Sequence, residues 1–192
     1  MNILYIHGWG SRFDPTNDKI LLLSEIGNVT GVDVDYTQPI SEIQETIYNA
    51  MIADDIDLLV GTSMGGYMAN LMGTTWCVPY VMINPATDPA ISLQKYIGAG
   101  IDYYDRHYTL RAETLTTFTS MSDNTNVPGL LLLDMADDVC NAVETNQMFL
   151  NSSNVSTYTW NDGSHRFDHM AESLPLIEDF DARNLSYGFG DN

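Results

Sequence analysis

The stretch "DLLVGTSMGGYMANLMG", residues 57–73, joins an apolar run directly to a helical pattern. The run Leu58–Val60 predicts a buried strand, and apolar side chains recur at helical spacing after Ser63. Glycines on both sides of Ser63 permit the sharp, strained turn of the G-x-S-x-G motif, which lifts a serine side chain clear of a sheet. We therefore predict that Ser63 is a nucleophile. A tight or phosphate-binding turn is the alternative interpretation.

Six short apolar runs predict strands, and several are continuously apolar, as in a sheet that is covered on both faces. They span residues 2–6, 31–36, 57–61, 79–83, 129–134 and 155–160. Amphipathic patterns lie between these runs, so strands and helices alternate along the chain. This order is typical of an α/β protein with a parallel sheet and helices on both faces, in a single domain over residues 1–192.

Local signals refine this prediction. Ser41 and Gln44 form the pattern of a capping box and predict the start of a helix. Pro175 is expected to kink or break the last helix. The longest interval between strands, residues 84–128, predicts one or two helices that form a small lid within residues 86–126. The end of the chain, residues 184–192, is expected to be frayed or loosely docked.

The chain has 192 residues, with 26 acidic side chains, 7 basic ones and a net charge of −19. Nucleic acids and anionic membranes are bound by clustered Lys and Arg, so this balance argues against both as partners. No run approaches the roughly 18 apolar residues of a membrane span. The start, "MNILYIHGWG", predicts a strand rather than a signal peptide. We expect a cytoplasmic protein that does not insert into membranes; its oligomeric state is not predicted.

The two cysteines, Cys77 and Cys140, are too few and too far apart to indicate a disulfide framework or a metal site. We expect both to be buried free thiols. The sequence predicts neither a metal nor a cofactor.

Sites in open parallel sheets form beyond the carboxyl ends of the strands. Asp137 follows the run at 129–134, and His165 follows the run at 155–160, so Ser63, Asp137 and His165 come in the order of the hydrolase triad. The other histidines are less well placed: His7, His107 and His169. Three further aspartates compete with Asp137 as the acid: Asp134, Asp138 and Asp162. Asp138 is equally suited to cap the next helix.

The segment "HGWG", residues 7–10, directly follows the first predicted strand. A loop at this position can offer a backbone N–H to an oxyanion beside the serine. We predict that the donors are the N–H groups of Trp9 and of Met64, the residue after the serine. We expect His7 to hold this loop by hydrogen bonds rather than to take part in catalysis.

These residues resemble the alpha/beta-hydrolase superfamily over essentially the whole chain, in a minimal version that lacks the first two strands. More narrowly, "LYIHGWGS", "VGTSMGGYMAN", "INPATDP", "ADDV" and "GSHRF" resemble the small bacterial YqiA-type esterases. Ala136 replaces a glycine of that family's acid motif, and Ser164 replaces an asparagine of its histidine motif. The resemblance implies hydrolysis of short acyl esters.

We therefore expect a serine esterase that acts on a small-molecule ester through Ser63, Asp137 and His165. One alternative is a thioesterase or lysophospholipase, whose longer acyl chain would lie among the tyrosines of the lid. Another is a binding protein on a hydrolase scaffold that does not catalyse a reaction. The acidity of the chain predicts a preference for neutral over anionic esters, unless Arg106 and Arg111 form a local basic pocket.

Overall fold

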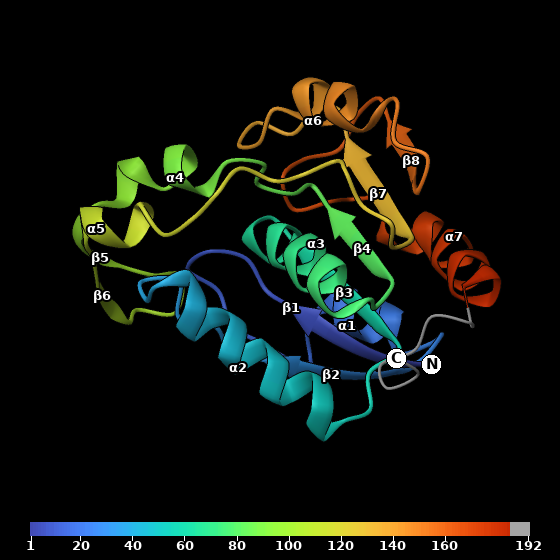
Figure 1. The fold of residues 1–192 in the computed structure, drawn as a ribbon, viewed down its shortest axis with the longest axis horizontal. Helices are drawn as coiled ribbons and strands as arrows, with labels where there is room; N and C mark the ends of the chain where they lie inside the picture. The colour runs from blue at the N-terminus through green and yellow to red at the C-terminus, as the bar shows by residue number, and fades with distance from the viewer. Residues whose placement is uncertain (185–192) are drawn as a thin grey trace.

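The computed structural model describes residues 1–184 and has a parallel sheet at its centre (Figure 1). Over these residues the sheet has six strands in the order β2-β1-β3-β4-β7-β8. Their bounds are Asn2–Ile6 (β1), Asn28–Val32 (β2), Leu58–Thr62 (β3), Tyr80–Ile83 (β4), Gly129–Asp134 (β7) and Val155–Trp160 (β8). Every neighbouring pair is parallel, so all carboxyl ends meet at one edge. The predicted parallel sheet is confirmed.

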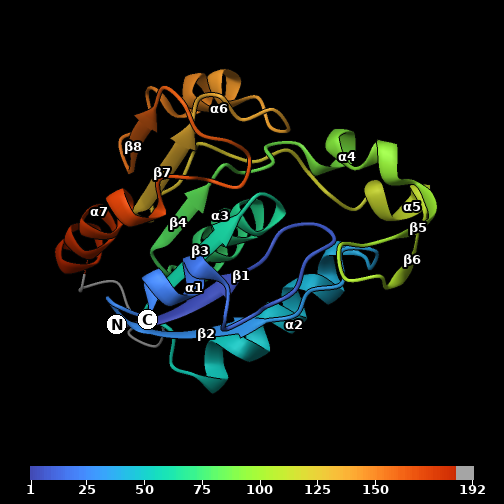
Figure 2. The same cartoon turned by 180° about the vertical axis from the view of Figure 1, so that it is seen from behind.

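Helices cover both faces of the sheet, as predicted. Figure 1 shows α2 (Ile40–Ala53) and α3 (Met64–Trp76) in front of it, and α6 (Ala142–Phe149) packs into the same core. Figure 2, from behind, shows α1 (Asp18–Leu23) and α7 (Met170–Arg183) on the other face. Successive strand residues point to opposite faces, which gives each face its own apolar core.

The second strand was predicted at 31–36, but β2 spans Asn28–Val32. The alternating pattern continues past the strand because Val34 and Tyr36 are buried in the loop that follows it. There the N–H of Val34 donates to His7 Nε2 at 2.9 Å, and the Tyr36 hydroxyl donates to the His7 carbonyl at 2.6 Å. A loop in which alternate side chains are buried has the same sequence pattern as a half-buried strand, although it lacks the backbone hydrogen bonds to a neighbouring strand.

A predicted helix start and a predicted helix break are wrong. α2 begins at Ile40, with Pro39 as its N-cap and no capping side chain, so Ser41 lies inside the first turn and forms no capping box. Pro175 does not break α7, which is continuous around it. Proline removes the hydrogen bond to the carbonyl four residues before it, here Ala171. Because Ala171 and Pro175 both lie on the exposed side of α7, water can take the place of the lost donor.

The insertion, residues 84–128, is not built from the one or two helices that were predicted. It contains an antiparallel hairpin of β5 (Gly98–Ile101) and β6 (His107–Leu110). Short helical turns flank it: α4 (Pro89–Ser92), η1 (Gln94–Tyr96) and α5 (Ala112–Leu115). The ring of Tyr108 packs against the backbone of Gly100, and a Cβ at Gly100 would overlap with that ring. Figure 1 shows the insertion, in green to yellow, at one end of the molecule.

The cysteine prediction is half right. Both thiols are free, but Cys77 is exposed at the C-cap of α3 and Cys140 is partly buried. The prediction for residues 184–192 falls almost wholly outside the described part of the chain. Within the described part, no helix has the length and apolar character needed to cross a membrane.

Candidate active site

Ser63 lies in the turn between β3 and α3, at φ 58° and ψ −121°. A residue with a side chain is rarely found at positive φ, and such strain is typical of a serine held at a strand-to-helix elbow. Gly61 and Gly65 make the turn possible, because a Cβ at Gly61 would overlap with the carbonyl of Gly65 and one at Gly65 with that of Ile6. The two glycines therefore allow β3, α3 and β1 to approach closely around Ser63.

The structure brings the three predicted triad residues together. His165 Nε2 is 3.0 Å from Ser63 Oγ, and His165 Nδ1 is 2.8 Å and 3.0 Å from the two carboxylate oxygens of Asp137. Asp137 Oδ1 also accepts hydrogen bonds from the N–H groups of Val139 and Cys140, at 2.7 and 2.9 Å. An acceptor-only carboxylate places the imidazole proton on Nδ1 and leaves Nε2 free to accept the serine proton.

The other three aspartates that were considered as the triad acid have different surroundings. Asp138 is exposed, and Asn141 rather than Asp138 caps α6 through a hydrogen bond from the N–H of Glu144. Asp162 is 85% exposed and lies 3.3 Å from His169 Nε2. Asp134 is fully buried and pairs with His169 Nδ1 at 2.7 Å. Of the four aspartates that were weighed, Asp137 is the one that contacts His165.

A buried network holds the loop that carries His165. Asp134 accepts from the N–H groups of Ser164 and Asp168, at 3.2 and 2.8 Å, as well as from His169. Asn84, directly after β4, donates to the Ser164 carbonyl at 2.9 Å and accepts from the N–H of Asp134 at 2.9 Å. Neither Asp134 nor Asn84 was predicted to have this role. The sequence signal for Asp134 was its position at the end of a continuously apolar strand. A carboxylate that is buried there has to be fully hydrogen-bonded.

The loop after β1 lies against the serine. A Cβ at Gly8 would come within 3.1 Å of Ser63 Cβ, so this loop touches the elbow. Met64 is the first residue of α3, and its N–H is one of the first-turn donors that have no acceptor within the helix. The Trp9 ring stacks on Tyr96 and meets Tyr108 edge-on, both at 5.2 Å between centroids. The loop that was predicted to hold an oxyanion is thus anchored to the insertion.

His7 holds this loop, as expected. Its Nδ1 is 2.8 Å from the Gly8 carbonyl, and its Nε2 accepts from Val34, which assigns the proton to Nδ1. Burial lowers the pKa of His7, so the ring stays neutral at physiological pH. With both ring nitrogens engaged, His7 has no free atom for proton transfer.

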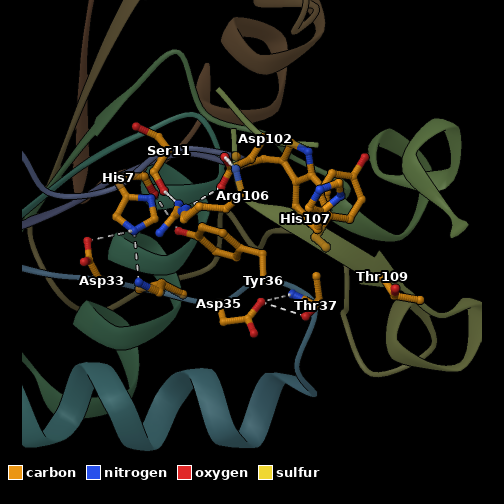
Figure 3. A pocket seen from close by; sticks show the side chains of 14 residues that line it. His7, Ser11, Asp33, Asp35, Tyr36, Thr37, Asp102, Arg106, His107 and Thr109 are labelled. Atoms are coloured by element: carbon orange, nitrogen blue, oxygen red, sulfur yellow. Dashed lines mark hydrogen bonds and ion pairs between the residues drawn. The ribbon is translucent and has the colours of Figure 1, made fainter. Parts of the chain in front are cut away.

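A cavity of about 390 Å³ lies beyond this loop (Figure 3). The loops after β1 and β2 and the hairpin of the insertion line it, including the exposed His107 on β6. Its walls carry the carboxylates of Asp33, Asp35 and Asp102 and the guanidinium of Arg106. Arg106 donates to Asp102 at 2.6 Å and to the Ser11 carbonyl at 2.9 Å, so its charge is paired. Ser63 and His165 are not among the lining residues.

Cys140 was not expected near this site, yet its thiol lies beside Asp137 and His165. Burial, followed by the charge of Asp137, raises the pKa of Cys140 to about 12. The thiol is therefore protonated at neutral pH and does not compete with Ser63 as a nucleophile.

The model of the uncharacterised protein family UPF0227 matches residues 2–182. The chain belongs to UPF0227. A UPF0227 protein of Vibrio cholerae is 22% identical over 187 residues, which cover 94% of this chain and 99% of the relative. The UPF0227 protein YcfP of Escherichia coli is 22% identical over 185 residues, covering 93% and 97%.

Solved structures show the fold of this UPF0227 chain. Est1E from Butyrivibrio proteoclasticus, with ferulic acid bound, superposes with a TM-score of 0.76 at 15% identity, covering 96% of this chain and 89% of Est1E. The Paleococcus ferrophilus monoacylglycerol lipase gives 0.71 at 15% identity, covering 95% and 94%. Mouse alpha/beta hydrolase domain-containing protein 10 gives 0.68 at 17% identity, covering 95% and 90%. The fold is that of the alpha/beta hydrolases, as the sequence indicated.

Proposed function

We propose that the protein is a serine hydrolase of short-chain carboxylic esters. The observation that carries this proposal is the continuous hydrogen-bonded chain from Ser63 Oγ through His165 to Asp137. Esterases and a lipase among the proteins of similar fold support the reaction class, and the ferulic acid bound to Est1E is the acid half of an ester. The substrate is a small-molecule ester, and the reaction needs no cofactor.

In this mechanism Ser63 Oγ attacks the ester carbonyl while His165 Nε2 takes the serine proton. Asp137 keeps the imidazole in the productive tautomer and stabilises its cationic form. The N–H groups of Trp9 and Met64 stabilise the oxyanion. His165 then protonates the departing alcohol, and water, activated by the same nitrogen, releases the acid and restores Ser63.

The test of this function is covalent labelling of the nucleophile. A fluorophosphonate should label Ser63 alone, and Ser63→Ala should lower kcat by roughly 10⁶-fold if the triad acts as a unit. A panel of esters with acyl chains of increasing length then measures specificity. Folded Ser63→Ala protein with undiminished turnover or labelling would disprove the proposal.

The second candidate function is that of a thioesterase or lysophospholipase, whose substrate would have a longer acyl chain. The tyrosines of the insertion favour the short-chain reading, because Tyr96 and Tyr108 pack on Trp9 and Tyr103 is 78% exposed. Tyr96 and Tyr108 thus form a small cluster around Trp9, and the cavity that Trp9 and Tyr108 line does not reach Ser63 or His165. A rise in kcat/KM with acyl length beyond about eight carbons would favour the second candidate.

Substrate charge gives a further prediction. Three carboxylates and one paired guanidinium line the cavity beside the loop of Trp9, and Arg111 is not part of its wall. A negative field lowers the local concentration of anions, and salt screens it. The test uses two esters that share one acyl group, one with a neutral and one with an anionic leaving group. At low salt the neutral ester should have a several-fold higher kcat/KM than the anionic one. The gap should narrow as salt is added; a preference for the anionic ester would show that Arg106 or Arg111 acts as a basic subsite.

A further inference from the structure

Cys140 completes a set of three metal-ligand side chains at the active site. The ligand atoms of Asp137, Cys140 and His165 all lie within 4.8 Å of one another. Asp137 and Cys140 belong to the loop after β7, where the N–H of Cys140 donates to Asp137 Oδ1 at 2.9 Å. His165 comes from the loop after β8 and contacts the same carboxylate. The thiol therefore lies against a pair that is already formed.

This donor set suits one chemical class of cation. Thiolate, imidazole and carboxylate are the ligands of zinc, at about 2.0 to 2.3 Å from the metal. Ligand atoms around a tetrahedral zinc ion are then about 3 to 4 Å apart. The oxygen of Asp137 and the nitrogen of His165 are 2.8 Å apart, so zinc binding requires this pair to open slightly and the thiol, within 4.8 Å of both atoms, to approach them. Magnesium and calcium prefer oxygen ligands and fit this set poorly.

A hollow next to the set gives a cation access to it. Its volume is about 270 Å³, and Asp137 and Cys140 are both in its wall. The remaining lining residues belong to the same segment, between Met135 and Val143, and include the exposed carboxylate of Asp138. Water in this hollow can supply a fourth ligand, and the acidic surroundings attract a cation.

We propose that Asp137, Cys140 and His165 form an inhibitory site for zinc-like divalent cations. The cation binds His165 Nδ1 while the imidazole proton moves to Nε2, and the thiol of Cys140 releases its proton to solvent. No group is oxidised or reduced. Nε2 then carries a proton and does not accept one from Ser63, so the nucleophile is no longer activated. The inhibition rests on the proposed function, whereas the binding of the metal does not.

The first experiment measures turnover of a neutral short-chain ester by the 192-residue chain at increasing concentrations of zinc chloride. The rate of each variant is compared with its own metal-free rate. Cys140→Ser removes the thiol, and Cys77→Ser is the matched control because Cys77 is exposed at the far end of α3. Zinc should inhibit the wild type and Cys77→Ser equally. Half-inhibition of Cys140→Ser should need at least about ten-fold more zinc. Equal inhibition of Cys140→Ser would overturn the proposal.

The second experiment detects binding without activity. Cobalt(II), a spectroscopic substitute for zinc, should give a thiolate-to-metal absorption band with the wild type and with Cys77→Ser, but not with Cys140→Ser. If the wild type gives no such band, or if Cys77→Ser loses it, the proposed site is wrong. This readout separates the two proposals: a protein that hydrolyses no ester but shows the Cys140-dependent band has the metal site without the proposed function. It also decides the question if Cys140→Ser does not fold.

Discussion

Two aspartate–histidine pairs lie side by side at the carboxyl edge of the sheet, with almost the same contact distance. Asp137 meets His165 Nδ1 at 2.8 Å, and Asp134 meets His169 Nδ1 at 2.7 Å. The difference lies at the other ring nitrogen. His165 Nε2 faces the hydroxyl of Ser63, whereas His169 Nε2 faces the carboxylate of Asp162.

The surroundings of the second pair favour a charged ring. His169 stacks on Trp160, with the ring planes 11° apart and the centroids 5.2 Å apart. Although burial opposes it, Asp134, together with Asp162 and Glu172, raises the pKa of His169. A histidine held between two carboxylates suits a structural clamp, while one held between a carboxylate and a hydroxyl suits proton transfer. The comparison shows that the aspartate contact alone does not identify a catalytic histidine.

The largest expected difference between the pairs is in turnover. His165→Ala should lower kcat by roughly 10⁶-fold, because the proposed base is removed. His169→Ala should keep kcat within about ten-fold of the wild type and lower the denaturant midpoint, because it leaves a buried carboxylate without its partner. Steady-state kinetics and urea unfolding measure both effects. An inactive His169→Ala protein beside an active His165→Ala protein would mean that the base is misassigned.

The next difference separates the two acids. Asp137→Asn should lower kcat by about 10⁴-fold with little change in KM, because an amide favours the wrong imidazole tautomer. Asp134→Asn should lower the free energy of unfolding by about 3 kcal/mol, since it breaks a pair whose carboxylate is fully buried, and should affect kcat less than Asp137→Asn does. The measurement compares, for each variant, the loss in kcat with the loss in free energy of unfolding. A larger kinetic loss in Asp134→Asn would give Asp134 the role proposed for Asp137.

The smallest effect is a pH dependence of stability. The pKa of His169 is raised above its ordinary value of 6.5, so the folded state binds this proton more tightly than the unfolded state. Its stabilisation is fully present below pH 6.5 and is lost as pH rises through the higher folded pKa. The difference in unfolding free energy between the wild type and His169→Gln should therefore be larger at pH 5.5 than at pH 9. A difference that grows with pH would show that the ring is neutral in the folded protein.

Much of this fold and candidate site follows from local sequence patterns. The first, fifth and sixth predicted strands match β1, β7 and β8 residue for residue. The first two are almost continuously apolar, and β8 is rich in β-branched and aromatic residues, which favour strands. The convergence of Ser63, Asp137 and His165 follows from parallel strands whose carboxyl ends share one edge.

Other features depend on contacts that are distant in sequence. Val34 and Tyr36 have the pattern of a strand, but their hydrogen bonds to His7 hold them in a loop. The hairpin of the insertion depends on packing between Gly100 and Tyr108 and on Trp9, which lies far away in the sequence. The position of Cys140 beside His165 depends on how two loops fold over one edge, and no spacing rule predicts it.

The hydrogen bonds of Asn84 also bear on the order in which this molecule assembles. One side chain joins the end of β4 to the end of β7 and to the loop after β8, across 50 and 80 residues of chain. Contacts of such separation form late, because closing long loops costs entropy before the contacts repay it. Helices and local turns can therefore be complete while His165 still lacks its place. During refolding, recovery of the proposed activity would report closure of the β4–β7–β8 side of the sheet, and would lag behind the recovery of helical signal.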